Sequence, residues 1–181
     1  MVNKLNDAKE HTALPGKIEK IREILAEVMD PEVPVLSVLD LGIVRDIKGE
    51  IKSNGEESWT IIITPTYTGC PAMDTISINI RLAMIAHGFN NVNVEMVLSP
   101  AWTTDWMSES GKMKLKEYGI APPNPKQQVC RNDLFAPDEA VQCPRCNSYR
   151  TERISEFGST ACKALFQCRD CNEPFDYFKC H

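Results

Sequence analysis

The sequence predicts an α+β protein, in which a small mixed three-stranded sheet with packed helices precedes a small, metal-stapled β domain. The apolar pattern over residues 16–120 gives helix, strand, strand, helix, strand and helix, in that order. Two Cys-x-x-Cys pairs follow near the C-terminus. With 181 residues, 43% of them hydrophobic, the chain can bury one modest core beside a smaller domain.

Four segments are expected. Residues 1–15 are polar and form a flexible tail, residues 16–120 form the α/β domain, residues 121–139 form a proline-containing linker, and residues 140–181 form the second domain. The tail has no apolar run typical of a signal peptide, and no apolar stretch is long enough to span a bilayer. Eight cysteines without a secretory signal favour the reducing cytoplasm, with no membrane as a partner.

The first half of the α/β domain reads as a helix followed by a hairpin. Apolar residues at three- and four-residue steps predict a helix over 16–29, which Asp30-Pro31 ends. Alternation predicts a strand over 43–47. Asn54-Gly55 is a hairpin turn signal before a second strand over 59–64, which is apolar enough to be central.

The second half begins with a helix that opens at Pro71 and ends before Gly88, a natural left-handed cap. Its apolar residues cover two faces, which indicates a helix enclosed between the sheet and another surface. A third strand is expected over 92–98. A last helix is expected over 104–118, with Gly111 as an interruption.

The four paired cysteines are Cys143, Cys146, Cys168 and Cys171. Their 21-residue separation suits a zinc ribbon, in which two tight turns aim four thiolates at one tetrahedral metal. Chance core cysteines do not explain two matched pairs, and redox dithiols usually occur singly beside a βαβ pattern. One structural zinc ion is therefore predicted.

Cys70 is the second candidate, because it lies immediately before the helix that opens at Pro71. Free backbone N–H groups and the helix dipole should lower the pKa of its thiol, which would make it a better metal ligand and nucleophile. The alternative is a small apolar residue packed under the helix, and position alone does not decide between them. Asp30 and Glu32 add carboxylates, although chemistry alone favours Asp30 as a turn residue before Pro31.

Other residues have weaker patterns. Trp102 and Trp106 are expected to be anchors in the core or on a partner surface. Cys162 and the terminal Cys180-His181 are either additional groups near the metal or simple structural residues, and Cys130 receives no role. There is no phosphate-binding glycine loop, nucleophile elbow or catalytic metal motif, so a non-catalytic protein is expected.

The charge is acidic, at −5 with an isoelectric point near 5.3. Residues 140–181 carry six Lys/Arg against five Asp/Glu, so the ribbon has no basic surface for nucleic acid.

Several segments form a recognisable pattern. They are Asp30-Pro-Glu-Val-Pro34, Asp40-Leu-Gly-Ile-Val44, Thr64-Pro-Thr66, Gly69-Cys-Pro71, the 99–106 segment with both tryptophans, and the ending 174–181. Through these segments the first domain resembles the MIP18 (DUF59) family. With the ribbon, the chain resembles, over roughly residues 17–181, the D proteins that accompany phenylacetyl-CoA epoxidases in phenylacetate degradation.

The resemblance implies a role in iron–sulfur cluster assembly or insertion, with Cys70, Asp30 and Glu32 handling iron or a transient cluster. The proteins of the epoxidase are the implied partners, above all its [2Fe–2S] reductase. One thiolate per chain cannot supply the four ligands that a cluster usually takes, so a homodimer, glutathione or the client must supply the rest. Two alternatives remain open: a structural component of the oxygenase, and a rubredoxin-like electron carrier with iron at the four paired cysteines.

Overall fold

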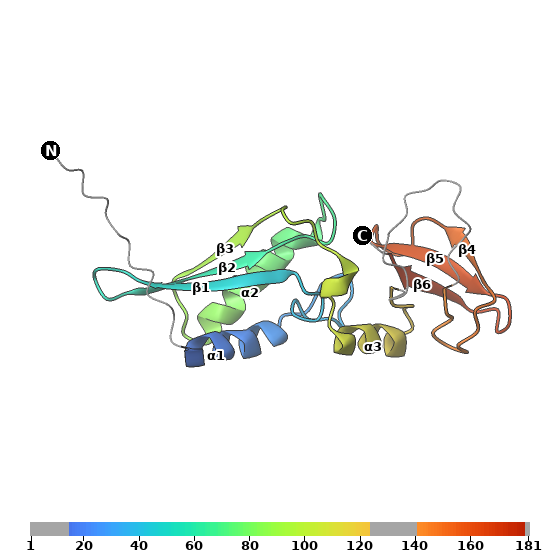
Figure 1. Ribbon diagram of the computed structural model, residues 1–181, viewed down its shortest axis with the longest axis horizontal. Helices are drawn as coiled ribbons and strands as arrows, with labels where there is room; N and C mark the ends of the chain where they lie inside the picture. The colour runs from blue at the N-terminus through green and yellow to red at the C-terminus, as the bar shows by residue number, and fades with distance from the viewer. Residues whose placement is uncertain (1–14, 124–140, 180–181) are drawn as a thin grey trace.

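The computed structural model describes residues 15–123 and 141–179, and Figure 1 shows two β-sheets side by side with the helices around the first. The first part contains α1 (Pro15–Ala26), β1 (Val44–Ile51), β2 (Glu57–Ile63), α2 (Ala72–Ala86), β3 (Val92–Met96) and α3 (Glu109–Tyr118). The second part contains β4 (Thr151–Ser155), β5 (Lys163–Cys168) and β6 (Pro174–Phe178). The predicted α+β fold and its order of elements are confirmed.

The first sheet is mixed and has the strand order β1-β2-β3. β1 pairs with β2 in antiparallel fashion, and Gly55 in the intervening hairpin adopts a left-handed φ of 84°. β2 and β3 are parallel, with Trp59 opposite Val92, and α2 forms the crossover between them. β2 is therefore the central strand, as its run of isoleucines predicts.

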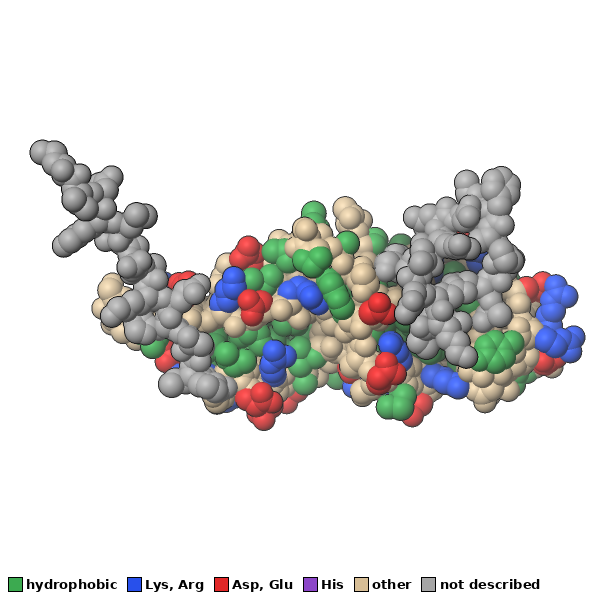
Figure 2. Space-filling model, viewed as in Figure 1, with side chains coloured by type: hydrophobic (Ala, Val, Ile, Leu, Met, Phe, Trp, Pro, Cys, Tyr) green, Lys and Arg blue, Asp and Glu red, His purple; other side chains and the backbone are tan. Residues whose placement is uncertain are grey.

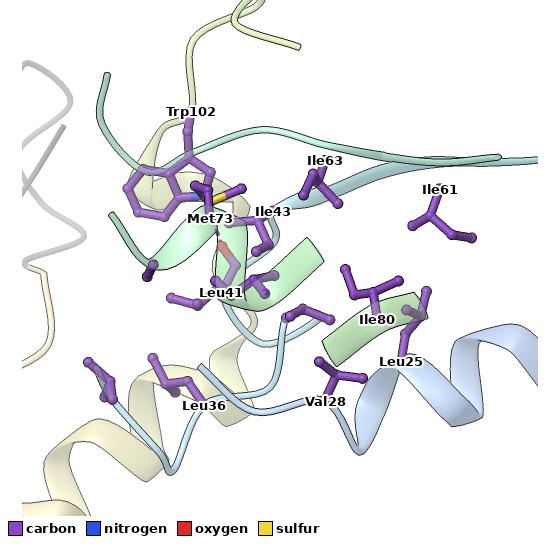
Figure 3. Close-up of a cluster of buried hydrophobic side chains, with 14 of the residues drawn as sticks. Leu25, Val28, Leu36, Leu41, Ile43, Ile61, Ile63, Met73, Ile80 and Trp102 are labelled. Carbon is purple, nitrogen blue, oxygen red and sulfur yellow. Dashed lines mark hydrogen bonds between the residues drawn. The ribbon is translucent and has the colours of Figure 1, made fainter. Parts of the chain in front are cut away.

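The core lies on one face of this sheet. Side chains of β2 point into it at Trp59, Ile61 and Ile63, where α1 and α2 cover them. Figure 3 shows Leu25 of α1 and Ile80 of α2 next to Ile61 in this cluster. The second apolar face of α2 behaves differently, since Ile78, Leu82 and Ile85 are 56%, 59% and 48% exposed. The expectation that α2 is enclosed on both faces is wrong for the part of the chain described.

Two predicted helix boundaries differ from the observed ones. α1 ends at Ala26, because Met29 pairs with Ser37 in a short bridge and no longer follows the helix. α3 begins at Glu109, after a separate 3-10 turn over Thr104–Trp106.

Gly111 lies inside α3 and does not interrupt it. A Cβ atom there would lie 3.0 Å from Cβ of Asp40, so glycine allows the helix to approach the 36–43 loop closely. Ser108 caps α3 by accepting a hydrogen bond from Gly111 N at 2.8 Å, and its hydroxyl donates to Asp40 Oδ1 at 2.8 Å. Lys114 completes the contact with an ion pair to Asp40 Oδ2 at 2.6 Å.

The second sheet is an antiparallel meander with the order β4-β5-β6, and it is joined to the first part by main-chain pairing. Ala121 forms a parallel bridge with Tyr177, in which Ala121 N donates to Asp176 O at 2.8 Å and Phe178 N donates to Ala121 O at 2.9 Å. The Phe178 side chain is 1% exposed and belongs to the core of the first part. The two parts therefore share a buried side chain as well as backbone hydrogen bonds.

Trp102 anchors this junction, whereas Trp106 packs within the first part. Trp102 is buried, and its Nε1 donates to Leu41 O at 2.9 Å (Figure 3). Its ring contacts that of Phe178, with 6.3 Å between the ring centroids. The ring of Trp106 lies beneath the guanidinium of Arg45, 3.3 Å from Cζ to the ring centroid. The sequence predicts anchors in the core or on a partner surface; Trp102 is a core anchor, and Trp106 is only partly buried against the core.

The surface carries both signs of charge. In Figure 2, Lys and Arg side chains are interspersed with Asp and Glu on the visible face. Among the helices of the described residues, none is long and apolar enough to cross a membrane.

Candidate metal centre and cysteine site

The four paired cysteines converge at one end of the second sheet. Cys143 Sγ lies 3.8 Å from Cys171 Sγ, and Cys146 Sγ lies 3.5 Å from Cys168 Sγ. All four sulfur atoms lie within 4.8 Å of one another. A tetrahedral ion with metal–sulfur bonds of about 2.3 Å would place its sulfurs about 3.8 Å apart, which these contacts match. The donor set and its geometry therefore fit a tetrathiolate metal ion.

The two turns that carry these cysteines are copies of one another. Each has the sequence Gln-Cys-x-x-Cys-Asn, and its Asn adopts a left-handed conformation, with φ 62° at Asn147 and 60° at Asn172. Asn tolerates this conformation better than most residues. Gln142 Nε2 donates to Asn147 O at 3.0 Å, and Gln167 Nε2 donates to Asn172 O at 3.3 Å. Sequence reasoning missed these supporting residues, although the six-residue repeat is visible in the chain.

Backbone hydrogen bonds lower the pKa of one thiol of the cluster, that of Cys168. The backbone N–H groups of Cys171 and Asp170 hold the pKa of Cys168 down to about 7. Cys143 and Cys168 are fully buried, whereas Cys146 and Cys171 are exposed. The cluster is therefore anchored in the ribbon core on one side and open to solvent on the other.

Cys70 lies directly before α2 and is partly buried. Its carbonyl accepts a hydrogen bond from Met73 N at 3.4 Å. Burial raises the pKa of the Cys70 thiol above its ordinary value of 9.0. Hydrogen bonds from Ala72 N and from the hydroxyl of Tyr67 act in the opposite direction, while the charges of Glu32 and Asp30 raise the pKa further. The expectation of a lowered pKa is therefore wrong, because desolvation and two carboxylates outweigh the start of the helix.

Asp30 and Glu32 come from the loop after α1. Asp30 is buried, and its Oδ1 accepts hydrogen bonds from the backbone N–H groups of Glu32 and Val33, each at 2.7 Å. Desolvation raises the pKa of Asp30 in spite of these two donors. Asp30 therefore shapes the loop that presents Glu32, and both carboxylates act electrostatically on Cys70.

Two residues of the second part reach this loop, and sequence reasoning did not connect them to it. Cys162 Sγ lies 3.7 Å from Glu32 Oε2, and Lys163 Nζ lies 3.5 Å from Glu32 O and 3.8 Å from Asp176 Oδ2. Cys162 is thus a neighbour of Glu32 and is not part of the four-sulfur set. No local pattern signals a contact across 130 residues. Cys130 and Cys180-His181 lie outside the described residues.

Comparison with known proteins identifies the family of this chain. It is 49% identical over 169 residues to a protein of Escherichia coli that is named as the D component of a "Putative 1,2-phenylacetyl-CoA epoxidase", covering 93% of this chain and 96% of that relative. Residues 127–179 match the family model of the PaaD zinc beta ribbon domain. The chain belongs to the PaaD family.

The first half of this PaaD-family chain has wider relatives. Residues 18–96 match the family model described as iron-sulfur cluster assembly protein. A Porphyromonas gingivalis protein named "Fe-S protein maturation auxiliary factor" is 33% identical, over 54% of this chain and 89% of the relative. A crystal structure of a DUF59 domain from Bacillus anthracis is 26% identical with a TM-score of 0.48, over 54% of this chain and 89% of that one. Both halves of the resemblance inferred from the motifs are confirmed.

Proposed function

We propose that this protein is a non-catalytic maturation factor, which assists the assembly or insertion of an iron–sulfur cluster in the phenylacetyl-CoA epoxidase, with the [2Fe–2S] reductase as its client. The position of Cys70 carries the proposal. This thiol lies beside two carboxylates within the half that matches the iron–sulfur assembly family. The relative that matches nearly the whole chain is named as a component of a putative phenylacetyl-CoA epoxidase, and this name supports a role in the phenylacetate pathway.

Cys70 is suited to hold iron transiently. Its raised pKa keeps the thiol protonated at neutral pH, so an incoming iron must displace the proton, which goes to solvent. This competition weakens binding and favours release to a client with a stronger ligand set. Glu32 offers a carboxylate near the thiol, and Asp30 fixes the loop that carries Glu32.

The ribbon has a separate, structural role in the proposal. Cys143, Cys146, Cys168 and Cys171 would hold one zinc ion. A bound zinc fixes the two turns relative to each other, and its binding free energy contributes to folding. Through Phe178 and Ala121 the ribbon would then also support the first part.

Cluster transfer tests the function. The protein is loaded with iron and sulfide without air, mixed with the apo-reductase, and the [2Fe–2S] spectrum and electron-transfer activity of the reductase are followed. Cys70→Ser should reduce the transfer rate at least tenfold, whereas Cys130→Ser, at a cysteine with no assigned role, should not. Equal transfer by wild type and Cys70→Ser would overturn the proposal.

A rubredoxin-like electron carrier is the second candidate, because the 3.5 and 3.8 Å sulfur contacts suit ferric iron as well as zinc. Metal content and colour separate the two. About one zinc per chain in colourless protein supports the structural role, and a red protein with iron at the four cysteines supports the carrier. The match to a zinc ribbon family favours zinc.

A further inference from the structure

The outer face of α2 carries an apolar stripe that the described part of the chain leaves open to solvent. Ile78, Leu82 and Ile85 follow one another at steps of four and three residues, and each is roughly half exposed. The opposite side of the same helix is buried, for example at Ile80 and Met84. Among the described helices, α2 alone has three exposed large apolar side chains. Apolar side chains that gather on one face, unlike scattered ones, indicate a binding surface.

Two charged residues border this stripe. Asp74 lies in the first turn of α2, Arg81 lies in its second half, and both are exposed. Neither forms an ion pair with another described residue. The outer face of α2 is therefore acidic near its start and basic further along. Such a face is complementary to a copy of itself that runs in the opposite direction, whereas a parallel copy would bring like charges together.

A two-fold axis perpendicular to α2 produces this antiparallel arrangement. Two-fold dimers are the commonest symmetric oligomers, and in them each copy presents the same surface to the other. Asp74 of each copy then lies towards the half of the other helix that carries Arg81, and symmetry repeats the contact once. The charges on α2 therefore favour a second copy in one particular orientation.

The area of the stripe suits a small, reversible interface. Two copies bring six large apolar side chains together, and each would remove on the order of 100 Å² from water. Because interfaces are roughly 56–65% apolar, the whole contact would bury about 1,000 Å² in total. This area lies at the low end of specific interfaces, where association is reversible. A dissociation constant on the order of micromolar is therefore expected.

We propose that the outer face of α2 is the interface of a homodimer, in which the stripe of Ile78, Leu82 and Ile85 packs against the same stripe of a second copy in antiparallel orientation. The apolar side chains provide the contact, and Asp74 with Arg81 sets its direction. The sequence predicts a helix enclosed on both faces, and the second copy encloses the face that is open in a single chain. The dimer does not depend on the proposed function, because it uses none of the cysteines.

The dimer keeps the two Cys70 sites apart. Cys70 directly precedes α2, whose 15 residues span about 22 Å. In an antiparallel pair the two Cys70 residues lie at opposite ends, on the order of 20 Å from each other or more, so one cluster cannot bind both. The remaining ligands of a cluster at Cys70 then come from the client or from glutathione, and not from the second copy. This consequence alone rests on the proposed function.

Sedimentation of the zinc-loaded full-length protein, over a series of micromolar concentrations, measures the dimer. Leu82→Lys and Ile78→Glu each place a charge inside the interface, and each should raise the dissociation constant at least tenfold. The matched control is Met113→Lys, because Met113 is 61% exposed on α3, and it should sediment as wild type. Unchanged zinc content and circular dichroism show that each variant is folded.

Charge reversal tests the orientation. Asp74→Lys and Arg81→Glu, made singly, bring like charges together in the antiparallel dimer, and each should weaken it about threefold to tenfold. The double variant restores opposite charges and should return the dissociation constant to nearly the wild-type value. A double variant as weak as the single ones overturns the antiparallel interface.

The remaining outcomes are equally decisive. A wild-type protein that stays monomeric at every concentration overturns the proposal, and so does a dimer that Leu82→Lys and Ile78→Glu leave intact. A monomer that binds the apo-reductase, and loses this binding in Leu82→Lys, also overturns it, because the client then covers the stripe. Cluster transfer by Cys70→Ser is measured separately, so a failure of the dimer and a failure of the proposed function are distinguishable.

Discussion

Phe178 links the ribbon to the core of the first part, so its truncation should destabilise a region that lies far away in sequence. An aromatic side chain buries roughly 150–250 Å², and at about 25 cal/mol per Å² this burial contributes about 4–6 kcal/mol. Phe178 is 1% exposed, and we expect Phe178→Ala to cost about 3–5 kcal/mol of unfolding free energy.

Tryptophan fluorescence in urea provides the assay. All three tryptophans, Trp59, Trp102 and Trp106, lie in the first part, so their emission reports its unfolding while the substitution lies in the ribbon. The matched control is Phe157→Ala, because Phe157 is a ribbon phenylalanine that is 64% exposed and should change stability by less than about 1 kcal/mol. If Phe178→Ala leaves the tryptophan transition where Phe157→Ala leaves it, the shared core is refuted.

Three further predictions concern packing, charge and metal. Gly111→Ala should lower the free energy of unfolding by about 1–3 kcal/mol, because the added Cβ would lie 3.0 Å from Asp40. The control Gly16→Ala, which has nothing within 4 Å of its added Cβ, should be neutral or slightly stabilising. The midpoints of urea unfolding measure both effects. Burial acts to raise the pKa of Asp40, but hydrogen bonds from Lys114, Ser108 and Ser37 hold it below the ordinary 3.8. The ionised carboxylate of Asp40 therefore stabilises the fold above pH 3.8, and this stabilisation is lost as the pH falls through the lowered pKa of the folded state. Asp40→Asn should remove this part of the acid dependence measured by thermal unfolding, and an unchanged profile would contradict it. A strong chelator should unfold the ribbon and, through Phe178, also lower the tryptophan transition of the first part; a shift confined to the ribbon's circular dichroism would contradict the coupling.

The sequence is sufficient to predict most of the first part. The order of elements, the central position of the 59–64 strand and the hairpin at Asn54-Gly55 follow from local periodicity and turn chemistry, and the structure confirms them. The convergence of the paired cysteines follows from their spacing, because each Cys-x-x-Cys turn aims two sulfurs at one point.

The features that sequence could not provide depend on tertiary contacts. From the sequence, Gly111 is expected to interrupt a helix. The structure shows that glycine is required there because Asp40 packs closely against it. The raised pKa of Cys70 depends on burial and on Glu32 and Asp30, which the fold brings from a distant loop. The contact of Cys162 with Glu32 joins two parts of the chain that share no local pattern.

The iron and sulfide content of the epoxidase reductase, purified from cells that carry either the wild-type protein or its Cys70→Ser variant, tests the central claim most directly. The account predicts a full [2Fe–2S] centre with wild type, and a reductase that is mostly apo with Cys70→Ser, at equal levels of both folded, zinc-containing proteins. A fully loaded reductase in the Cys70→Ser cells would contradict the claim that this chain matures the centre through Cys70.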